Sequence, residues 1–352
     1  MGEDALTQPD AENRVPDADE TIEAWSRSTG MVLGKFYPPT LGHCYLVDFA
    51  RHYVGHLTVI VASLSNETIP GDTRAAWMRE MFPDAHVIHI TDEIPQDPGE
   101  PTNLWRIWRD TIRRVLPEGP DYLFASEAYG IELARVLGAT YVPVDHARAL
   151  RQVRASDVRA DPMTHWRWLP GPVRPYFVRR VCIIGPEATG KTTLADRLAR
   201  HYDTAMVGEF ARSLVDVSGR RVSDHLFPMI LKGQAASEAA MARQANRVLI
   251  CDSDAFTTML YRRLFFGDCP DYLRAEAERE RYDLYLLTTP DTPAHDGAPP
   301  SHPEQRSWFF ERSVEWLTRR AANYVVVNGS WDERFAAATK AIDTLLAANA
   351  IP

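Results

Sequence analysis

The chain has 352 residues, with 39 Lys and Arg against 48 Asp and Glu, so its formal net charge is −9 at pH 7. This acidic balance argues against nucleic acid or an anionic membrane surface as a partner, because the long-range field of the protein would repel both. No apolar run approaches the roughly 20 residues that cross a bilayer, and the N-terminus lacks a signal-peptide pattern, so a cytoplasmic protein is expected.

At one domain per roughly 100–200 residues, the length predicts two domains. Residues 1–28 are rich in Asp, Glu, Pro and Ala, which predicts a disordered acidic leader that is too short for a helix-turn-helix module. The four cysteines, Cys44, Cys182, Cys251 and Cys269, are far apart and form no C-x-x-C pair. Reduced thiols are therefore expected, rather than a disulfide framework or a zinc site.

Between residues 29 and 172, short apolar runs alternate with amphipathic stretches. The runs predicted to be strands are "MVLGKF" (31–36), "LTVIVAS" (57–63), "AHVIHIT" (85–91), "DYLFASE" (121–127) and "TYVPVD" (140–145). The stretches predicted to be helices cover 42–54, 71–82, 102–116 and 128–137. The alternation is typical of a parallel sheet covered by crossover helices, so this part is expected to be a Rossmann-like α/β domain.

The alternation stops at 161–180, a segment dense in Pro, Arg and aromatic residues, and a second α/β domain is expected over 173–352. Its predicted strands are "VRRVCIIG" (178–185), "TAMVGEF" (204–210), "RVLICDSD" (247–254), "YDLYLLTTP" (282–290) and "NYVVVNG" (323–329). Its predicted helices cover 191–201, 224–246, 256–280, 306–321 and 332–348. The fold class is thus α/β, with two consecutive parallel-sheet domains.

The segment "GPEATGKT" (185–192) fits the phosphate-loop pattern G-x-x-x-x-G-K-[ST], after a predicted strand and before a predicted helix. Backbone N–H groups of such a loop and the start of the helix bind phosphates. Lys191 can reach the β- and γ-phosphates, and the Thr192 hydroxyl can ligate Mg²⁺. The residues expected to bind ATP here are Gly185, Glu187, Ala188, Thr189, Gly190, Lys191, Thr192 and Thr193.

Acidic side chains follow two strands of the second domain. Asp252 and Asp254 would point the same way at strand geometry, so that one enters the Mg²⁺ shell and the other accepts the proton of an attacking hydroxyl. A solvated strand end is the alternative. Glu209 and Arg212, one helical turn apart, could hold ribose hydroxyls or phosphates, or could form a surface ion pair.

A polar loop, 291–306, lies where a lid over the phosphates is usual, and Arg306 is its candidate for neutralising transition-state charge. The domain lacks the N-K-x-D motif with which G proteins read the base. A compact phosphate-loop domain with acids beside the phosphates is most typical of a small-molecule kinase.

The first domain has its own glycine-rich turn, "GKFYPPTLGH" (34–43). Gly34 ends a predicted strand and Gly42-His43 opens the next helix, so backbone N–H groups and the His43 side chain are directed to one place. This suits nucleotidyl transfer, in which an acceptor phosphate attacks the α-phosphate of a nucleotide and pyrophosphate leaves, because that chemistry needs only positioning and charge stabilisation. A capping or core role for His43 is the alternative.

Here "GKFYPPTLGH" resembles the [HT]-x-G-H signature of the nucleotidylyltransferase superfamily, in the form found in the NadR family. That family is one of bifunctional nicotinamide-mononucleotide (NMN) adenylyltransferases and ribosylnicotinamide kinases. Further segments follow in the family's order: "FASEAYGIELARVLGATYVPVDHAR", "VRADPMTHWRWL", "RPYFVRRVCIIGPEATGKTTLADRLA", "GEFAR", "RVLICDSDAFTT" and "YDLYLLTTPDTP". The resemblance covers about 31–345, which includes both domains.

The resemblance implies that the C-terminal domain uses ATP and Mg²⁺ to phosphorylate nicotinamide riboside to NMN, and that the N-terminal domain adenylylates NMN to NAD. In the N-terminal domain it implies an ATP site of Gly34, Lys35, Phe36, Thr40, His43, Ser156 and Arg159, and a substrate site of Trp105, Trp108, Asp145 and Arg148. The two tryptophans, three apart on one helix face, could equally be core residues.

In the kinase half the resemblance implies that Asp252 faces the ribose 5′-hydroxyl and joins Thr192 at the metal. By the resemblance, Glu209 and Arg212 would help to hold the substrate. Asp254 and Arg306, which the residues themselves suggest, are expected at the same substrate site. The expected partners are ATP, nicotinamide riboside, NMN and NAD, and a homo-oligomer is compatible with this class of enzyme.

The chain departs from the family pattern at 153–159, where I-S-x-T-x-[IV]-R becomes V-R-A-S-D-V-R. Arg154 replaces a Ser that helps to seat phosphate, and Asp157 adds a negative charge near the phosphates. In the kinase half Ala188 replaces a Ser of the phosphate loop, and no Arg follows Asp-Gly in the lid. One alternative is therefore an enzyme that is kinase-only or altered in substrate, with a degenerate adenylyltransferase half. A nucleotide-sensing regulator is another.

Overall fold

The computed structural model describes residues 25–94, 103–145, 153–217, 223–290 and 303–348. The chain divides into two compact units, Met1–Arg159 and Ala160–Pro352. This division falls earlier in the chain than the boundary expected at 172/173. The segment just after the division is bound to the second unit, because the Trp166 indole Nε1 donates a hydrogen bond to the Ala245 carbonyl at 3.0 Å. Of the leader expected over 1–28, residues 1–24 lie outside the described residues, while residues 25–27 are helical, so the expected disorder does not extend to them.

The first unit contains five parallel strands in the order β3-β2-β1-β4-β5. Their bounds are β1 (Thr29–Gly34), β2 (His56–Ala62), β3 (His86–Ile90), β4 (Tyr122–Ala125) and β5 (Thr140–Pro143), each within or overlapping a predicted run. The helices between them are α2 (Leu41–Tyr53), α3 (Gly71–Met81), α4 (Leu104–Val115) and α5 (Tyr129–Leu137), and a short α6 (Ala155–Ala160) follows. The predicted alternation is confirmed, and only α6 was not expected.

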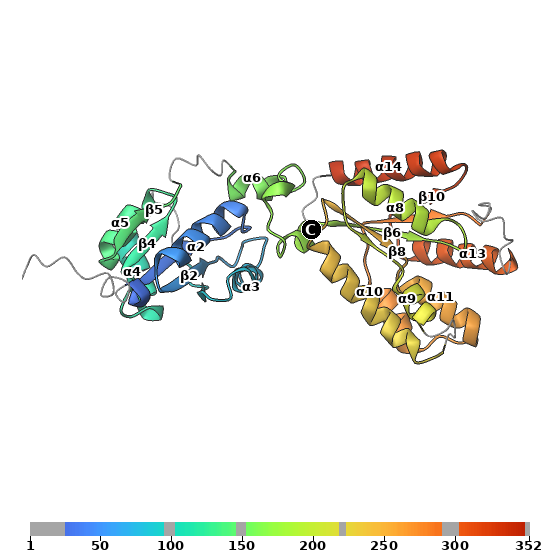
Figure 1. Cartoon of the computed structure of the whole chain (residues 1–352), viewed down its shortest axis with the longest axis horizontal. Coiled ribbons are helices and arrows are strands. Elements are labelled where there is room, and N and C mark those ends of the chain that lie inside the picture. Colours follow the sequence, from blue (N-terminus) through green and yellow to red (C-terminus); the bar gives the residue numbers. More distant parts are fainter. Residues whose placement is uncertain (1–24, 95–102, 146–152, 218–222, 291–302, 349–352) are drawn as a thin grey trace, which may run out of the picture. The chain divides into compact units, whose positions relative to one another are not determined.

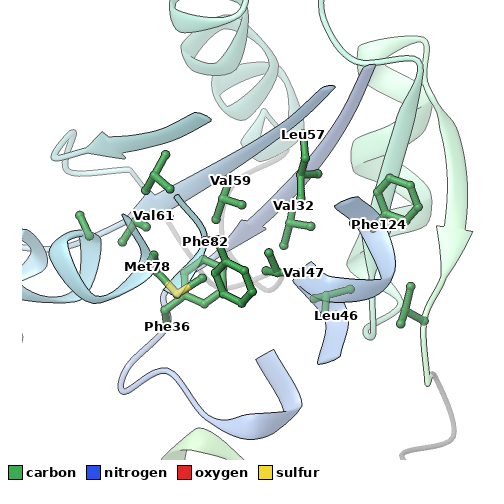
Figure 2. Packing of buried hydrophobic residues seen from close by; sticks show 14 of the residues in the cluster. Val32, Phe36, Leu46, Val47, Leu57, Val59, Val61, Met78, Phe82 and Phe124 are labelled. Carbon is green, nitrogen blue, oxygen red and sulfur yellow. The ribbon is translucent and has the colours of Figure 1, made fainter. Parts of the chain in front are cut away.

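Alternate residues of each strand enter two different cores, one on each face of the sheet. On one face Val32 and Val59 pack with Val47 of α2 and Met78 of α3. Figure 2 shows this packing, in which Phe36, two residues after β1, lies beside Met78 and Phe82. On the other face, the neighbouring strand residues Met31 and Ile60 pack with α4 and α5 through Trp108, Ile112 and Leu133. Helices on both faces shield the sheet from solvent, while the carboxyl ends of the strands remain accessible to ligands.

The second unit also contains five parallel strands, in the order β10-β9-β6-β8-β7. Their bounds are β6 (Arg179–Ile184), β7 (Met206–Val207), β8 (Val248–Asp252), β9 (Leu284–Thr288) and β10 (Tyr324–Val327). The predicted helices are present as α8 (Lys191–His201), α10 (Leu226–Ala242), α11 (Ala255–Phe266), α12 (Asp271–Arg279), α13 (Pro303–Arg319) and α14 (Trp331–Ala347). The elements not expected are η2 (Trp166–Trp168), α7 (Arg174–Phe177) and α9 (Phe210–Val217). Most of these elements can be followed in Figure 1.

The two sheets share one arrangement. The strand at the centre of each, β1 in the first and β6 in the second, leads directly into a glycine-rich turn. In open α/β sheets, ligands bind beyond the carboxyl end of a strand whose neighbouring connections cross opposite faces of the sheet. α8 and α14 pack on one face of the second sheet, through residues such as Leu194 and Ile342.

All four cysteines are free, as the sequence predicts. Among the described residues, no helix is both long and apolar enough to cross a membrane.

A group of buried acids lies beside α11 and α12. Asp254 is 2% exposed, and the Glu280 Oε2 accepts a hydrogen bond from the Ala255 N–H at 2.8 Å. Burial raises the pKa of Glu280, and the nearby Asp254 carboxyl raises it further. Burial also raises the pKa of Asp254. The folded unit therefore binds protons at these carboxyls more tightly than the unfolded chain does.

A carboxyl whose pKa is raised by folding stabilises the protein at low pH, and that stabilisation is lost as the pH rises through the raised pKa. We expect Glu280→Gln, which keeps the acceptor for Ala255, to increase the free energy of unfolding of the second unit by about 1–2 kcal/mol at about pH 8. At about pH 5 it should change little. Urea unfolding at the two pH values measures this, with Glu311→Gln, an exposed carboxyl on α13, as the control. An equal effect at both pH values would contradict it.

Candidate functional site: two phosphate-binding turns

The first unit contains a cavity of about 880 Å³ at the carboxyl ends of β1 and β4. Most residues predicted for the N-terminal site line it, from four separate segments of the chain. They are Gly34, Lys35, Phe36, Thr40, His43, Trp105, Trp108, Asp145, Ser156 and Arg159. Arg148 lies outside the described residues. The structure therefore brings together residues that are more than 100 positions apart in sequence.

His43 both caps a helix and lines the cavity, so the two alternatives weighed for it are compatible. The Thr40 side chain accepts from the His43 N–H at 3.5 Å, and the Thr40 N–H donates to the His43 Nδ1 at 3.1 Å, which closes a capping box at the start of α2. Since Nδ1 accepts a backbone N–H, the proton of the neutral ring is on Nε2. His43 is thus oriented as a donor from Nε2.

A buried ion pair fixes the turn after β1, and sequence reasoning did not detect it. Arg74 of α3 is fully buried, and its Nη1 donates to the Lys35 carbonyl at 2.7 Å. Its Nη2 donates to Glu67 Oε2 at 2.5 Å, while Lys35 Nζ lies 3.2 Å from Glu67 Oε1. Burial alone would raise the pKa of Glu67, but hydrogen bonds from the Leu64 N–H and from Arg74 lower it. Glu67 therefore stays ionised and holds both cations.

Arg159 is held against the same turn. Its Nη1 donates to the Tyr37 carbonyl at 2.7 Å, and its guanidinium lies 4.1 Å from the centre of the Tyr37 ring. The Tyr37 hydroxyl is in turn fixed by Thr68, whose N–H donates to it at 2.8 Å. The guanidinium is therefore positioned at the cavity by stacking and one hydrogen bond.

Aromatic side chains of α4 and α5 also line the cavity. Trp108 is 7% exposed and belongs to the core between the sheet and α4, while Trp105 is partly buried against that core. Both also line the cavity, so a core role and a ligand contact coexist. Tyr129, which sequence reasoning missed, lines it too and donates from its hydroxyl to the Leu33 carbonyl at 2.8 Å. Burial raises the pKa of Tyr129, so it remains a neutral donor.

In the second unit, the segment 185–192 forms a phosphate loop between β6 and α8. Three of its residues, Gly185, Ala188 and Gly190, have positive φ angles of 145°, 55° and 80°. Successive turns of this kind direct backbone N–H groups into one concavity. The exposed residues of the segment are Glu187 and Ala188, and Thr193 is exposed in the first turn of α8. Thr189 is buried, with its hydroxyl 2.6 Å from that of Thr288.

Lys191, Thr192 and Asp252 meet at this loop, as the sequence predicts. Lys191 is 8% exposed, and its Nζ donates to the Pro186 carbonyl at 2.9 Å. Burial lowers the pKa of Lys191, although Glu209 and Asp252 oppose that shift. The Thr192 hydroxyl donates to Asp252 Oδ2 at 2.5 Å. Within the described part of the chain, the buried Asp252 Oδ1 has no hydrogen-bond partner.

Asp254 differs from the expectation that it points the same way as Asp252. β8 ends at Asp252, Ser253 has a positive φ of 77°, and the chain therefore turns before Asp254. The Asp254 side chain accepts from the Thr257 N–H at 2.8 Å and caps α11. This capping bond, made by a carboxyl that is 2% exposed, gives Asp254 a structural task in the fold.

Glu209 and Arg212 lie after β7, with Arg212 Nη2 3.7 Å from Glu209 Oε2. The Glu209 side chain is 19% exposed, and the Arg212 side chain is 64% exposed. Burial raises the pKa of Glu209, while the Lys191 charge lowers it. Glu209 therefore lies close enough to the phosphate loop for its carboxylate to interact electrostatically with Lys191. Arg306 lies in the first turns of α13, and the remainder of the predicted lid, 291–302, lies outside the described residues.

Helix α14 packs against the phosphate loop and supports its conformation, a role that sequence reasoning also missed. Arg334 of α14 is 2% exposed, and it donates from Nη1 to the Thr189 carbonyl at 3.1 Å and from Nε to the Gly329 carbonyl at 2.8 Å. Trp331 lies so close to Gly190 that an added Cβ would come within 2.1 Å of its ring. Only glycine fits at residue 190, for its φ and for this contact.

Known proteins share this organisation over both units. Residues 180–334 match the family model described as "AAA domain". The chain is 28% identical to the "Trifunctional NAD biosynthesis/regulator protein NadR" of Escherichia coli (strain K12) over 338 residues, which covers 88% of this chain and 81% of that protein. The protein of the same name from Salmonella typhimurium is also 28% identical, over 337 residues. These similarities extend over both units and support the resemblance to the NadR family.

The fold of NadR agrees. A crystal structure of NadR protein in complex with NR has a TM-score of 0.71 and 22% identity to this chain, covering 91% of this chain and 96% of that one. A second, of NadR protein in complex with NAD and AMP-PNP, has a TM-score of 0.70 with the same identity and coverage. The NadR-like succession of two parallel five-stranded domains, predicted from the sequence, is therefore confirmed.

Arg74 provides a test of how the first turn is held. Arg74→Met should destabilise the first unit by about 3–5 kcal/mol, because it leaves the Glu67 carboxylate buried without its main partner. The double variant Glu67→Gln/Arg74→Met should recover part of that loss, since no buried charge remains unpaired. Urea unfolding measures both, with Arg79→Met, an exposed arginine of the same helix, as the control. A loss no larger than that of the control would overturn the assignment.

Proposed function

We propose that the chain is a two-domain NAD salvage enzyme. The C-terminal domain phosphorylates nicotinamide riboside to NMN with ATP, and the N-terminal domain adenylylates NMN to NAD with release of pyrophosphate. The observation that carries the proposal is that each domain has a glycine-rich turn after its central strand, with the side chains predicted for that site beside it, in a chain similar to NadR over both domains. NadR crystal structures in complex with NR, and with NAD and AMP-PNP, support these ligands.

In the N-terminal domain, a phosphate oxygen of NMN forms a bond to the α-phosphorus of ATP, and the bond from that phosphorus to the bridging oxygen of pyrophosphate breaks. The chain supplies position and positive charge for this step. His43 Nε2–H, fixed by the capping box, and Arg159, fixed on Tyr37, would donate to the phosphates. Trp105 or Trp108 would contact the nicotinamide ring.

In the C-terminal domain, the ribose 5′-hydroxyl attacks the γ-phosphorus of ATP, and the bond to the β-phosphate oxygen breaks. The two carboxylate oxygens of Asp252 have different surroundings and could therefore have different roles. Oδ2 is beside the Thr192 hydroxyl, while the buried Oδ1 has no hydrogen-bond partner in the described part of the chain and could accept the proton of the 5′-hydroxyl. Lys191, released from the Pro186 carbonyl, would reach the β- and γ-phosphates.

Thr192 and Asp252 also suit Mg²⁺. Both offer oxygen ligands, and within the described residues no group of three or more His, Cys, Asp or Glu could hold a metal by itself. Mg²⁺ in phosphoryl-transfer sites is held by one or two protein oxygens together with substrate phosphates and water, so the small ligand set fits. When bound, the ion would neutralise charge on the transferring phosphoryl group.

One feature favours a second candidate, a kinase whose adenylyltransferase half has lost or changed its activity. The Ser156 hydroxyl, expected to bind phosphate, donates to the Asp157 carboxylate at 3.3 Å. A negative charge at this place opposes the binding of a triphosphate. In the phosphate loop of the kinase half the change is milder, because Ala188 replaces a Ser where the loop backbone binds the phosphates, so this candidate keeps the first step and gives up the second.

Single variants separate the two steps, because each catalytic residue belongs to one domain. With Mg-ATP and NMN, we expect His43→Ala to reduce NAD formation by about 10²–10³-fold, as when one transition-state donor is removed, while Lys191→Ala leaves it nearly intact. With Mg-ATP and nicotinamide riboside, Lys191→Ala should abolish NMN formation, and His43→Ala should not. Chromatography of products measures both. No NAD from NMN with the unaltered chain would favour the kinase-only candidate.

A further inference from the structure

The cations that line the N-terminal cavity are not equally available to a ligand. Lys35 is paired with Glu67 at 3.2 Å, and the Arg159 Nη1 donates to the Tyr37 carbonyl. Arg154 lines the same cavity and is exposed. Over the ranges that the structure describes, its guanidinium has neither an ion pair nor a hydrogen bond. Arg154 thus offers the cavity a full set of donors.

The neighbouring residue Asp157 explains why an added cation is useful here. Its Oδ2 accepts from the Arg154 N–H at 3.2 Å, and its Oδ1 accepts from the Ser156 hydroxyl at 3.3 Å. The hydroxyl that would donate to a phosphate is therefore engaged, and a negative charge stands beside the site. Arg154, two residues before Ser156, could supply a hydrogen-bond donor in place of the Ser156 hydroxyl and a positive charge that offsets Asp157.

We propose that Arg154 is a binding residue for the phosphate chain of ATP in the N-terminal cavity, and that it replaces the donor which Ser156 gives to Asp157. This rests on the proposed adenylyltransferase function of the domain. The polyphosphate is favoured over the single phosphate of NMN because it carries more charge than Lys35, His43 and Arg159 together can match while two of them have other partners.

The inference is tested in a Lys191→Ala background, in which the phosphate loop of the second domain is impaired. Arg154→Gln keeps the length and one donor but removes the charge. We expect it to weaken binding of α,β-methylene-ATP about tenfold, the usual effect of losing one charge-assisted hydrogen bond at a partly solvated site. Arg154→Lys should restore most of that affinity, and Arg106→Gln, an exposed arginine of α4 outside the cavity lining, should have no effect. Calorimetric titration measures the four chains.

Steady-state rates distinguish the phosphate that Arg154 binds. Arg154→Gln should raise the KM for ATP about tenfold, in line with its binding loss, and leave the KM for NMN within about twofold. The Asp157→Ala variant should lower the KM for ATP, because it frees the Ser156 hydroxyl and removes a repelling charge. A raised KM for NMN alone would assign Arg154 to the acceptor and overturn the proposal, as would unchanged nucleotide binding in Arg154→Gln.

The role of Arg154 and the adenylyltransferase activity of the N-terminal domain can be tested separately. Unchanged nucleotide affinity in Arg154→Gln, together with normal NAD formation, refutes the role of Arg154 and leaves the adenylyltransferase in place. A tenfold loss of nucleotide affinity without any NAD formation in the Lys191→Ala chain supports the role of Arg154 and refutes the adenylyltransferase. Unfolding midpoints equal to that of the background chain show that the variants compare folded proteins.

Discussion

The feature on which both domains depend is a central parallel strand that ends in a turn rich in backbone donors. β1 and β6 each lie at the centre of their sheet, and ligands of open α/β sheets bind beyond the carboxyl ends of such strands. Backbone N–H groups at such an end must find an acceptor, and a phosphate group satisfies several of them at once. Two phosphate sites in one chain can therefore arise from the same arrangement, a central strand followed by a glycine-rich turn, present in each domain.

Each turn is held by a buried arginine from a later helix. Arg74 binds the Lys35 carbonyl in the first unit, and Arg334 binds the Thr189 carbonyl in the second. In a trans peptide the N–H points opposite to the carbonyl, so fixing these two oxygens also fixes the N–H groups of Phe36 and Gly190. The buried charge is costly, but it supports an arrangement of donors that is ready before a ligand arrives.

The sequence was sufficient for the strands, most of the helices and the motifs, because period-two runs, glycine turns and the spacing of Gly185 to Thr192 are local signals. It could not show which distant side chains support them. Arg74 and Arg334 stand among ordinary helical residues, and only the folded chain brings them to their carbonyls. Asp254 was misplaced on a strand because the positive φ of Ser253 leaves no clear mark in the sequence.

The number of nucleotides that one chain binds tests the central claim most directly. Calorimetric titration with AMP-PNP and Mg²⁺ should give two molecules per chain for the unaltered protein, since each central strand ends in its own site. In the Lys191→Ala variant only one should remain, at the N-terminal cavity. A single molecule per chain in the unaltered protein, or loss of all binding in the Lys191→Ala variant, would contradict the claim that the two sites are separate.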